Sequence, residues 1–244
     1  MRHEELTHGQ GISVICAMAD EARPFVRRLQ KQSQTNKIDV IQTGLGEDRI
    51  LDLLSRAAPS EQSAMIVVGT AAATVEDLRT GDAIIYSAVI DESGHSQTLS
   101  PELSTSLQQI LSSLNPRQCI GLTTKTPITE PREKTKLGRK HAASCIDMET
   151  AIVASYAASM GRPIACVRVI LDTAEQAIPQ PALDGLCEDG TTNIWRLTRS
   201  LVSKPAAVPQ LLKLGSQYRA ALNTINAIAA LVFDNVDSLS AENC

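Results

Sequence analysis

The sequence predicts an α/β fold in which a mixed β-sheet lies between two layers of helices. Short apolar runs alternate along the chain with segments whose apolar residues recur every three or four positions. Hydrophobic residues make up 43% of the chain, yet only two Phe, three Tyr and one Trp are present. A core of Ala, Val, Ile and Leu is typical of strands that helices cover on both faces. We expect residues 1–244 to form one such domain, with residues 1–11 flexible.

The apolar runs predict the strands, because each run is short and is bounded by glycine or polar residues. The expected strands are residues 12–18, 37–44, 63–69, 83–91, 118–124 and 163–172. Residues 81–100 have the pattern of a β-hairpin, which is why we expect a mixed sheet rather than a purely parallel one.

Segments of helical spacing separate these strands and follow the last of them. The expected helices are residues 20–32, 45–58, 100–114, 129–138, 147–161, 194–204 and 208–233. Residues that favour helix ends set several of these bounds. Thr129 and Asp147 are predicted N-caps, and Gly138 and Gly161 are predicted C-terminal ends.

Charge and composition argue against several classes of protein. The net charge of −4 and the pI of about 5.6 give no electrostatic footprint for nucleic acid. No apolar run approaches the roughly 20 residues of a membrane span, and the N-terminal segment lacks the apolar core of a signal peptide. The six cysteines form no C-x-x-C pair, and no His or Cys cluster has metal-ligand spacing. We therefore expect a cytoplasmic protein of the bacterial type, with reduced thiols and no metal.

Carboxylates follow three of the predicted strands, at the edge where ligands bind in open α/β sheets. Glu21, Glu149 and Asp172 come from distant parts of the chain, and we expect them to converge at this edge. Each also has a structural alternative, because acidic residues favour the first turn of a helix and Asp favours turns. Asp147 is best explained as a helix cap. Arg168 lies inside an apolar strand and needs a carboxylate partner if it is buried.

Four segments carry, in the right order, the patterns of a known family. The stretch "CIDMETAIVASYAASMGRPIACVRVILDTA" is similar to (V/I)-x-M-E-x-A-A-x-A followed by R-x-(I/V)-S-D. The stretches "ICAMADEA", "TGLGEDRI" and "VVGTAAATVEDLRTGDAII" resemble A-M-x-x-E, S-G-x-G and G-(S/T)-A-G-x-L…GD. Together they resemble the purine nucleoside phosphorylase and nucleosidase family, which includes the methylthioadenosine/S-adenosylhomocysteine nucleosidases. "AEQAIPQPAL" and the long C-terminal helical segment most resemble its hopanoid-associated phosphorylase branch.

The resemblance implies a role for each of these carboxylates. Asp172 would be the general acid that protonates N7 of the purine, and Glu21 would orient the attacking water, so both are implied to be catalytic. Glu149 would bind the ribose hydroxyls and stabilise the oxocarbenium charge, with Met148 packing under the sugar. The other substrate-binding residues that the resemblance implies are Thr70, Ala71 and Ala72.

The implied activity is cleavage of the N-glycosidic bond of a purine nucleoside, with release of adenine. Adenosylhopane, an intermediate of hopanoid synthesis, is a candidate substrate. Hydrolysis is favoured over phosphorolysis, because Val67 stands where phosphorylases of the family place a phosphate-binding arginine. Arg23 and Arg49 stay as candidate phosphate ligands. The resemblance implies no cofactor, apart from phosphate as the co-substrate of a phosphorylase, and it implies a homodimer or a larger homo-oligomer.

The chain also departs from the family pattern. Leu171 stands in place of the serine before the acidic residue, and residues 71–73 read Ala-Ala-Ala where the family has Ala-Gly-Gly. The two extra methyl groups lie where the backbone of the family approaches its ligand. These departures keep open a non-catalytic nucleoside-binding protein. A lipid-linked substrate further predicts transient contact with a membrane surface and an apolar channel lined by residues 178–186 or the C-terminal helices.

Overall fold

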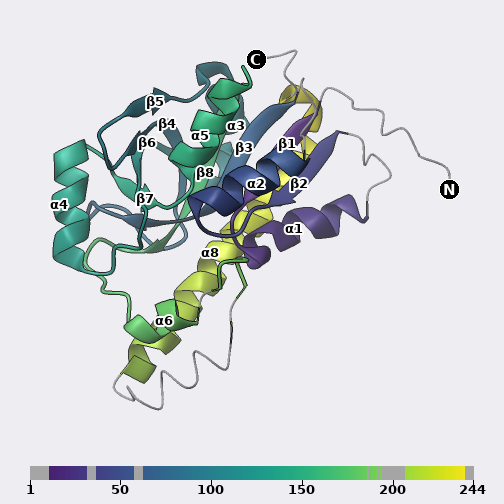
Figure 1. Ribbon diagram of the computed structural model, residues 1–244. Helices are drawn as coiled ribbons and strands as arrows, with labels where there is room; N and C mark the ends of the chain where they lie inside the picture. Colours follow the sequence, from purple (N-terminus) through teal and green to yellow (C-terminus); the bar gives the residue numbers. More distant parts are fainter. Residues whose placement is uncertain are drawn as a thin grey trace.

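A mixed sheet of eight strands lies between two layers of helices in the computed structural model (Figure 1). The structure describes residues 11–31, 37–57, 63–185, 187–191, 193 and 207–239. Seven strands are hydrogen-bonded in the order β2-β1-β3-β7-β6-β4-β5, and β8 pairs with both β3 and β4. The strands, in chain order, are β1 (Ile12–Cys16), β2 (Ile38–Gln42), β3 (Ala64–Ala73), β4 (Ala83–Asp91), β5 (Ser96–Thr98), β6 (Arg117–Thr123), β7 (Cys145–Asp147) and β8 (Ile164–Asp172).

The pairing directions confirm the predicted mixed sheet. The strands β1, β2, β3 and β8 run parallel to their neighbours in this group. The strand β4 is antiparallel to β8 and forms the predicted hairpin with β5, whereas β6 is parallel to β4. The short strand β7 is parallel to β6 and antiparallel to the end of β3.

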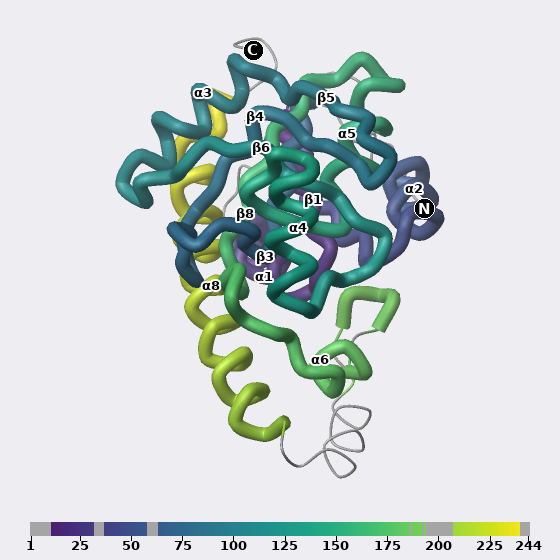
Figure 2. The backbone as a smooth tube through the Cα atoms, turned by 90° about the vertical axis from the view of Figure 1, so that its left-hand side faces the viewer, coloured from purple at the N-terminus to yellow at the C-terminus, as the bar shows by residue number. Residues whose placement is uncertain are grey.

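Helices pack on both faces of the sheet, and Figure 2 shows α3 and α8 on one side and α2 on the other. The first layer consists of α1 (Ala19–Leu29), α3 (Pro101–Ile110) and α8 (Val208–Asp234). The second layer consists of α2 (Glu47–Ala57) and α5 (Thr150–Ser159). The remaining helical elements are α4 (Pro131–His141), α6 (Gln180–Asp184), η1 (Ser112–Leu114) and η3 (Val236–Leu239). Among the helices that the structure describes, none is long and apolar enough to cross a membrane.

Aliphatic side chains form a separate core on each face of the sheet. Along β8, Ala165, Val167 and Val169 pack in the core under α1, α3 and α8. Cys166 and Ile170 face the core under α2 and α5. This alternation is the period-2 pattern of a strand that is covered on both sides. Arg168 is the charged residue in this strand, and it lies between Cys166 and Ile170 on the same face of the pleat.

Two boundaries predicted at glycine residues differ from the structure. β3 continues four residues beyond Gly69, because Ala72 and Ala73 pair with β7 on one side and the strand pairs with β8 on the other. α4 continues past Gly138 to His141 and ends at Ala142, which has a positive φ of 51°. Gly138 was therefore wrongly predicted as the helix end. It is buried against Thr74, and a Cβ at this position would lie 2.6 Å from the Thr74 hydroxyl.

Two further predictions fall on residues that the structure does not describe. The predicted helix at residues 194–204 lies outside the described residues, as do residues 1–10 of the N-terminal segment. Gly11 is described and is buried, with its carbonyl accepting a hydrogen bond from the Ala64 N–H at 3.1 Å. The five cysteines in the described part of the chain are free thiols.

Candidate active site

Asp147 organises the junction between β7 and α5. Its Oδ1 accepts hydrogen bonds from the backbone N–H of Glu149 at 3.0 Å and of Thr150 at 2.9 Å, and its Oδ2 accepts from the Thr150 hydroxyl at 2.6 Å. Thr123 of β6 donates to the same Oδ1 at 2.8 Å. Asp147 thus binds the first free N–H groups of the helix, as a cap does. The predicted helix start was nevertheless wrong by two residues, because Asp147 still pairs with β6 and Glu149 takes the N-cap position.

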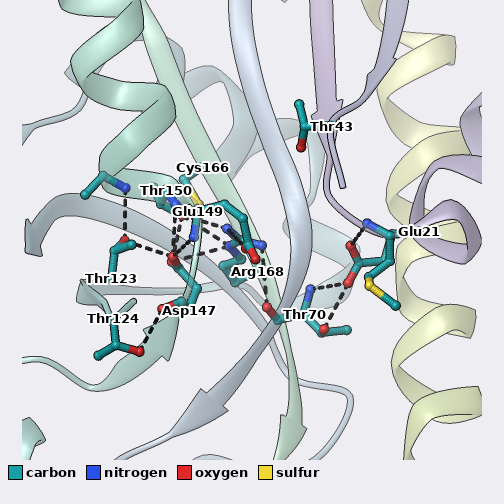
Figure 3. A network of polar contacts seen from close by, with 12 residues as sticks. Glu21, Thr43, Thr70, Thr123, Thr124, Asp147, Glu149, Thr150, Cys166 and Arg168 are labelled. Atoms are coloured by element: carbon teal, nitrogen blue, oxygen red, sulfur yellow. Dashed lines mark hydrogen bonds and ion pairs between the residues drawn. The ribbon is translucent and has the colours of Figure 1, made fainter. Parts of the chain in front are cut away.

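Arg168 lies at the centre of a buried polar cluster (Figure 3). Its Nη2 donates to Glu149 Oε2 at 3.1 Å and to the Thr150 hydroxyl at 2.8 Å. Its Nε lies 3.5 Å from Asp147 Oδ2, and its side chain is only 1% exposed. The prediction that a buried Arg168 holds a carboxylate is therefore confirmed, with two carboxylates rather than one. Removing one partner of such a buried ion pair leaves an uncompensated charge, so the cluster depends on all its members.

Glu21 reaches this cluster from the first turn of α1. Its Oε1 accepts hydrogen bonds from the Thr70 N–H at 2.8 Å and from the Thr70 hydroxyl at 2.9 Å. Its Oε2 accepts from the Met18 N–H at 3.2 Å, which is a helix-capping contact. The carbonyl of Thr70 lies 3.5 Å from Arg168 Nη1. Thr70 therefore connects Glu21 to the Arg168 cluster. Glu21 both caps α1 and lies beside this cluster.

Gly69 makes this approach of charges possible. A Cβ at this position would overlap with Arg168 Nη1 and would lie 3.1 Å from Glu21 Oε2. Any larger residue would therefore displace the guanidinium from its carboxylate partners, because the other atoms around it are buried. Side-chain packing explains why a glycine is required at the centre of β3, since the φ of Gly69 is not in the left-handed region.

Burial and mutual repulsion shift the pKa values of these carboxyl groups. Burial raises the pKa of Glu149 to about 7; Arg168 opposes the shift, and the nearby charges of Asp147 and Glu21 add to it. Burial also raises the pKa of Glu21, and here Arg168 and the hydrogen bonds from Thr70 oppose the shift. Near neutral pH, Glu149 can therefore either donate or accept a hydrogen bond. Carboxyl groups with such shifts are typical of functional sites.

Asp172 ends β8 but does not join this cluster. It pairs with Ala72 of β3, whereas Arg168 pairs with Gly69, so Asp172 lies further toward the carboxyl end of the sheet. Its carboxylate forms an ion pair with Lys134 of α4, and the two side chains are 2% and 0% exposed. Burial raises the pKa of Asp172, and Lys134 opposes this shift. Lys134 was not singled out from the sequence, because α4 also carries exposed basic residues, at Arg132, Lys136, Arg139 and Lys140.

The other predicted ligand-binding residues lie on β3 and in the bend between β7 and α5. Thr70, Ala71 and Ala72 all belong to β3; Thr70 is hydrogen-bonded to Glu21, and Ala72 pairs with Asp172 in the sheet. The half-buried Met148 lines an open groove of about 760 Å³, together with Leu45 and Ile152. Five carboxylates also line this groove: Glu47, Asp48, Asp91, Glu92 and Glu188. Among the described residues, neither residues 178–185 nor α8 line this groove, where the sequence predicted residues 178–186 or the C-terminal helices.

The segment at residues 187–190 closes one side of the site through backbone contacts. The carbonyl of Glu188 accepts from the Leu45 N–H at 2.8 Å, and the carbonyl of Gly190 accepts from the Ala19 N–H at 3.1 Å. Asp189 accepts through its carbonyl from the Gln42 side chain at 2.9 Å. Within the residues that the structure describes, no group of three His, Cys, Asp or Glu side chains is arranged to hold a metal ion.

Comparison with known proteins decides the family. A model of the Phosphorylase superfamily matches residues 40–199, which is more than half of the 244 residues. The chain belongs to the phosphorylase superfamily. The superfamily match includes Lys134, Glu149 and Asp172, and Glu21 lies before its first residue. No match was found among curated protein sequences.

Solved structures share the phosphorylase superfamily fold at low sequence identity. Futalosine hydrolase of Helicobacter pylori strain 26695 is 15% identical, with a TM-score of 0.68, over 93% of this chain and 98% of that chain. A putative 5′-methylthioadenosine/S-adenosylhomocysteine nucleosidase of Francisella philomiragia is 17% identical, with a TM-score of 0.68, over 94% and 99% of the two chains. A mutant nucleosidase of the same kind from Helicobacter pylori, with 5′-methylthioadenosine in its active site, is 18% identical, with a TM-score of 0.61, over 80% and 99%.

Proposed function

We propose that this protein hydrolyses the N-glycosidic bond of a purine nucleoside and releases adenine. One observation carries the proposal: Thr70 and Arg168 link the buried carboxyl groups of Glu21 and Glu149, which come from opposite layers of the sheet. Asp172 follows Arg168 by four residues on the same strand. Membership of the phosphorylase superfamily supports a nucleoside as the substrate, as do the names of the hydrolase and nucleosidases that share the fold.

Glu149 is proposed to bind the ribose hydroxyls, with Met148 packing under the sugar. Arg168 binds Oε2 of Glu149, so that Oε1 can accept a hydrogen bond from a hydroxyl. Positive charge develops on the ribose as the glycosidic bond breaks, and a fixed carboxylate in a water-poor site stabilises that charge. Met148 borders the groove beside this cluster, which is the place where a sugar would lie.

Glu21 is proposed to accept a proton from the attacking water, and Asp172 is proposed to donate a proton to the departing base. Water attacks C1′ and gives a proton to Glu21, whose oxygens retain free lone pairs although Thr70 and Met18 already bind them. The electron pair of the C1′–N9 bond leaves with the base, which takes up a proton at N7 from Asp172. General acid catalysis of this kind accelerates a reaction by about 10²–10⁴.

Two of the three candidate phosphate-binding positions favour water over phosphate as the nucleophile. Val67 is 2% exposed and packs in the core under α2 and α5, so this position offers no phosphate ligand. Arg23 is bound to Asp20 at 2.7 Å on the surface. Arg49 lines the groove, over Gly44, and stays a candidate phosphate ligand for the phosphorylase alternative.

The groove beside Met148 supports a substrate with an apolar group on the ribose. Leu45, Met148 and Ile152 provide apolar contacts. The five carboxylates that line the same groove outnumber its two cations, Arg49 and Lys125, which disfavours an anionic group there. A 5′-alkylated adenosine fits this lining better than a 5′-phosphate. Adenosylhopane stays a prediction of the sequence resemblance within this class.

A product analysis tests the proposal. The full-length protein is incubated with adenosine and 5′-alkylated adenosines, with and without phosphate, and free base and sugar products are measured by mass spectrometry. We expect adenine and free ribose, at a rate that does not depend on phosphate. Ribose 1-phosphate would instead identify a phosphorylase, and calorimetric binding of adenosine without turnover would identify a non-catalytic binding protein.

A further inference from the structure

We propose that Lys134 is a positioning residue for Asp172, and that it supplies, through Asp172, the proton that the departing base takes up. This inference rests on the proposed function, because it explains how Asp172 can act as an acid while it is held in an ion pair. It adds a residue from α4 to a site whose other members lie on the sheet, on α1 and at the start of α5.

The contacts of Lys134 are confined to the segment that carries Asp172. Its Nζ donates to the Asp172 carboxylate, to the carbonyl of Gln176 at 2.7 Å and to the carbonyl of Thr173 at 3.3 Å. An ammonium group has three protons to donate, and these three acceptors use all of them. Lys134 therefore fixes both the carboxylate of Asp172 and the four residues that follow it.

Burial separates Lys134 from the other basic residues of α4. Arg132, Lys136 and Arg139 are exposed, whereas Lys134 has no exposed surface. Burying an ammonium group costs several kcal/mol before its attraction to a carboxylate is counted. A protein with apolar residues in place of a buried ion pair is often equally stable or more stable. A buried ion pair at the end of β8 is therefore better explained by a role in the site than by stability alone.

A second set of contacts holds the same segment from the opposite side. The side-chain amides of Gln176 and Gln217 of α8 are hydrogen-bonded at 2.7 Å, and Gln217 also donates to the Thr80 hydroxyl at 3.0 Å. Thr80 in turn donates to the carbonyl of Leu171 at 3.0 Å. Asp172 thus lies between Leu171 and Thr173, whose carbonyls both accept hydrogen bonds. Apart from Lys134, the groups in these contacts are neutral amides, carbonyls and a hydroxyl.

The ion pair explains where the proton is held before the reaction. Beside an ammonium group, Asp172 is a carboxylate and has no proton of its own to give. As the C1′–N9 bond breaks, a proton passes from Asp172 to N7 of the base while Lys134 Nζ passes one to Asp172. Asp172 ends as a carboxylate and Lys134 as a neutral amine. The proton that the attacking water leaves on Glu21 returns to the solvent, from which Lys134 is protonated again, so that charge and atoms balance.

Substitution of Lys134 tests this inference through the pH dependence of kcat. Lys134→Met removes the group that opposes burial, so the pKa of Asp172 rises further and Asp172 itself carries the proton at low pH. We expect a loss in kcat of about 100-fold or more near neutral pH, with KM little changed and with recovery as the pH falls toward 5. Lys134→Arg keeps the positive charge but cannot release a proton, so we expect the same loss without recovery.

Controls separate this inference from the proposed function. Lys136→Met, on the exposed face of the same helix, is expected to keep the wild-type kcat, and urea unfolding shows whether each variant folds. An active wild-type protein whose Lys134→Arg variant retains its kcat and pH profile would overturn the proton supply alone. A wild-type protein that releases no base would overturn the proposed function, and the proton supply with it.

A measurement without turnover tests the positioning. The double variant Lys134→Met with Asp172→Asn is compared with the two single variants in urea unfolding. We expect the double variant to lose far less stability than the sum of the two, because the partners act as one unit. Additive losses would overturn the positioning role, whether or not the protein is active.

Discussion

At the residue scale, Arg168 is the buried cation that compensates the charges of the carboxylates in its cluster. It faces Asp147 and Glu149 directly and lies near Glu21, and it is buried with them. We expect Arg168→Met to lower the free energy of unfolding by about 3–5 kcal/mol at neutral pH, because it leaves buried carboxylates without a cation. Urea unfolding measures the change. Arg56→Met breaks an exposed ion pair with Asp52 and serves as the control, and equal losses in the two variants would contradict this account.

The raised pKa of Glu149 gives a second prediction at this scale. The pKa of Glu149 is about 7 in the folded protein, and the ordinary value of a glutamate, which applies to the unfolded chain, is 4.5. Between pH 4.5 and pH 7, the folded state therefore binds a proton that the unfolded state has released. The associated stability is fully present below about pH 4.5 and is lost as the pH rises through about 7. We therefore expect the stability of Glu149→Gln relative to the wild type to increase from pH 5 to pH 8, by roughly 2–3 kcal/mol. A pH-independent difference in urea unfolding would refute the shift.

Sequence reasoning found part of the site at the residue scale. The order of strands and helices places Glu21 and Glu149 at the same edge of the sheet, and an arginine in an apolar strand demands a carboxylate partner. The ion pair of Lys134 with Asp172 could not be predicted, because one inward lysine in a highly charged helix has no distinguishing pattern. The separation of Asp172 from Arg168 follows from their four-residue spacing on one strand, whereas the position of Arg168 beside Gly69 depends on strand register, which local sequence does not specify.

At the scale of elements, β3 carries the site through Gly69 and Thr70. We expect Gly69→Ala to destabilise the protein by about 1–3 kcal/mol and to lower its activity, because the added Cβ overlaps with the Arg168 guanidinium. Gly215→Ala in α8 is the matched control, since no atom lies within 4 Å of its added Cβ. This control is expected to be stabilising by about 0.5–1 kcal/mol. Urea unfolding of both variants checks the pair, and a harmless Gly69→Ala would contradict the packing described for β3.

The boundaries of elements were predicted less well than their existence. A strand end at Gly69 follows from the small residues after it, yet pairing with β7 and β8 extends β3 to Ala73. A helix end at Gly138 follows from the usual preference of glycine for helix ends, yet α4 uses this glycine to approach Thr74. In both cases a long-range contact decides the outcome, and neighbouring residues in the sequence do not reveal it.

At the scale of the whole molecule, the alternation of apolar runs and helical segments was sufficient to predict the three layers and the mixed sheet. The order of the strands was not predictable. β8 lies between β3 and β4, parallel to one and antiparallel to the other, and it places Arg168 beside the centre of β3 and Asp172 beside its end. The site therefore depends on the complete sheet, and Glu21 of α1, Lys134 of α4 and Glu149 at the start of α5 add charged groups from outside it.

Release of adenine by the Asp172→Asn variant tests the central claim most directly. The rate is measured with a 5′-alkylated adenosine, for the variant and the wild-type protein under the same conditions, with urea unfolding to show that the variant is folded. The account predicts rapid release by the wild type and a loss in kcat of about 10²–10⁴ in the variant, because the base then leaves without its proton donor. Undiminished release by a folded Asp172→Asn variant would contradict the assignment of Asp172 and the mechanism built on it.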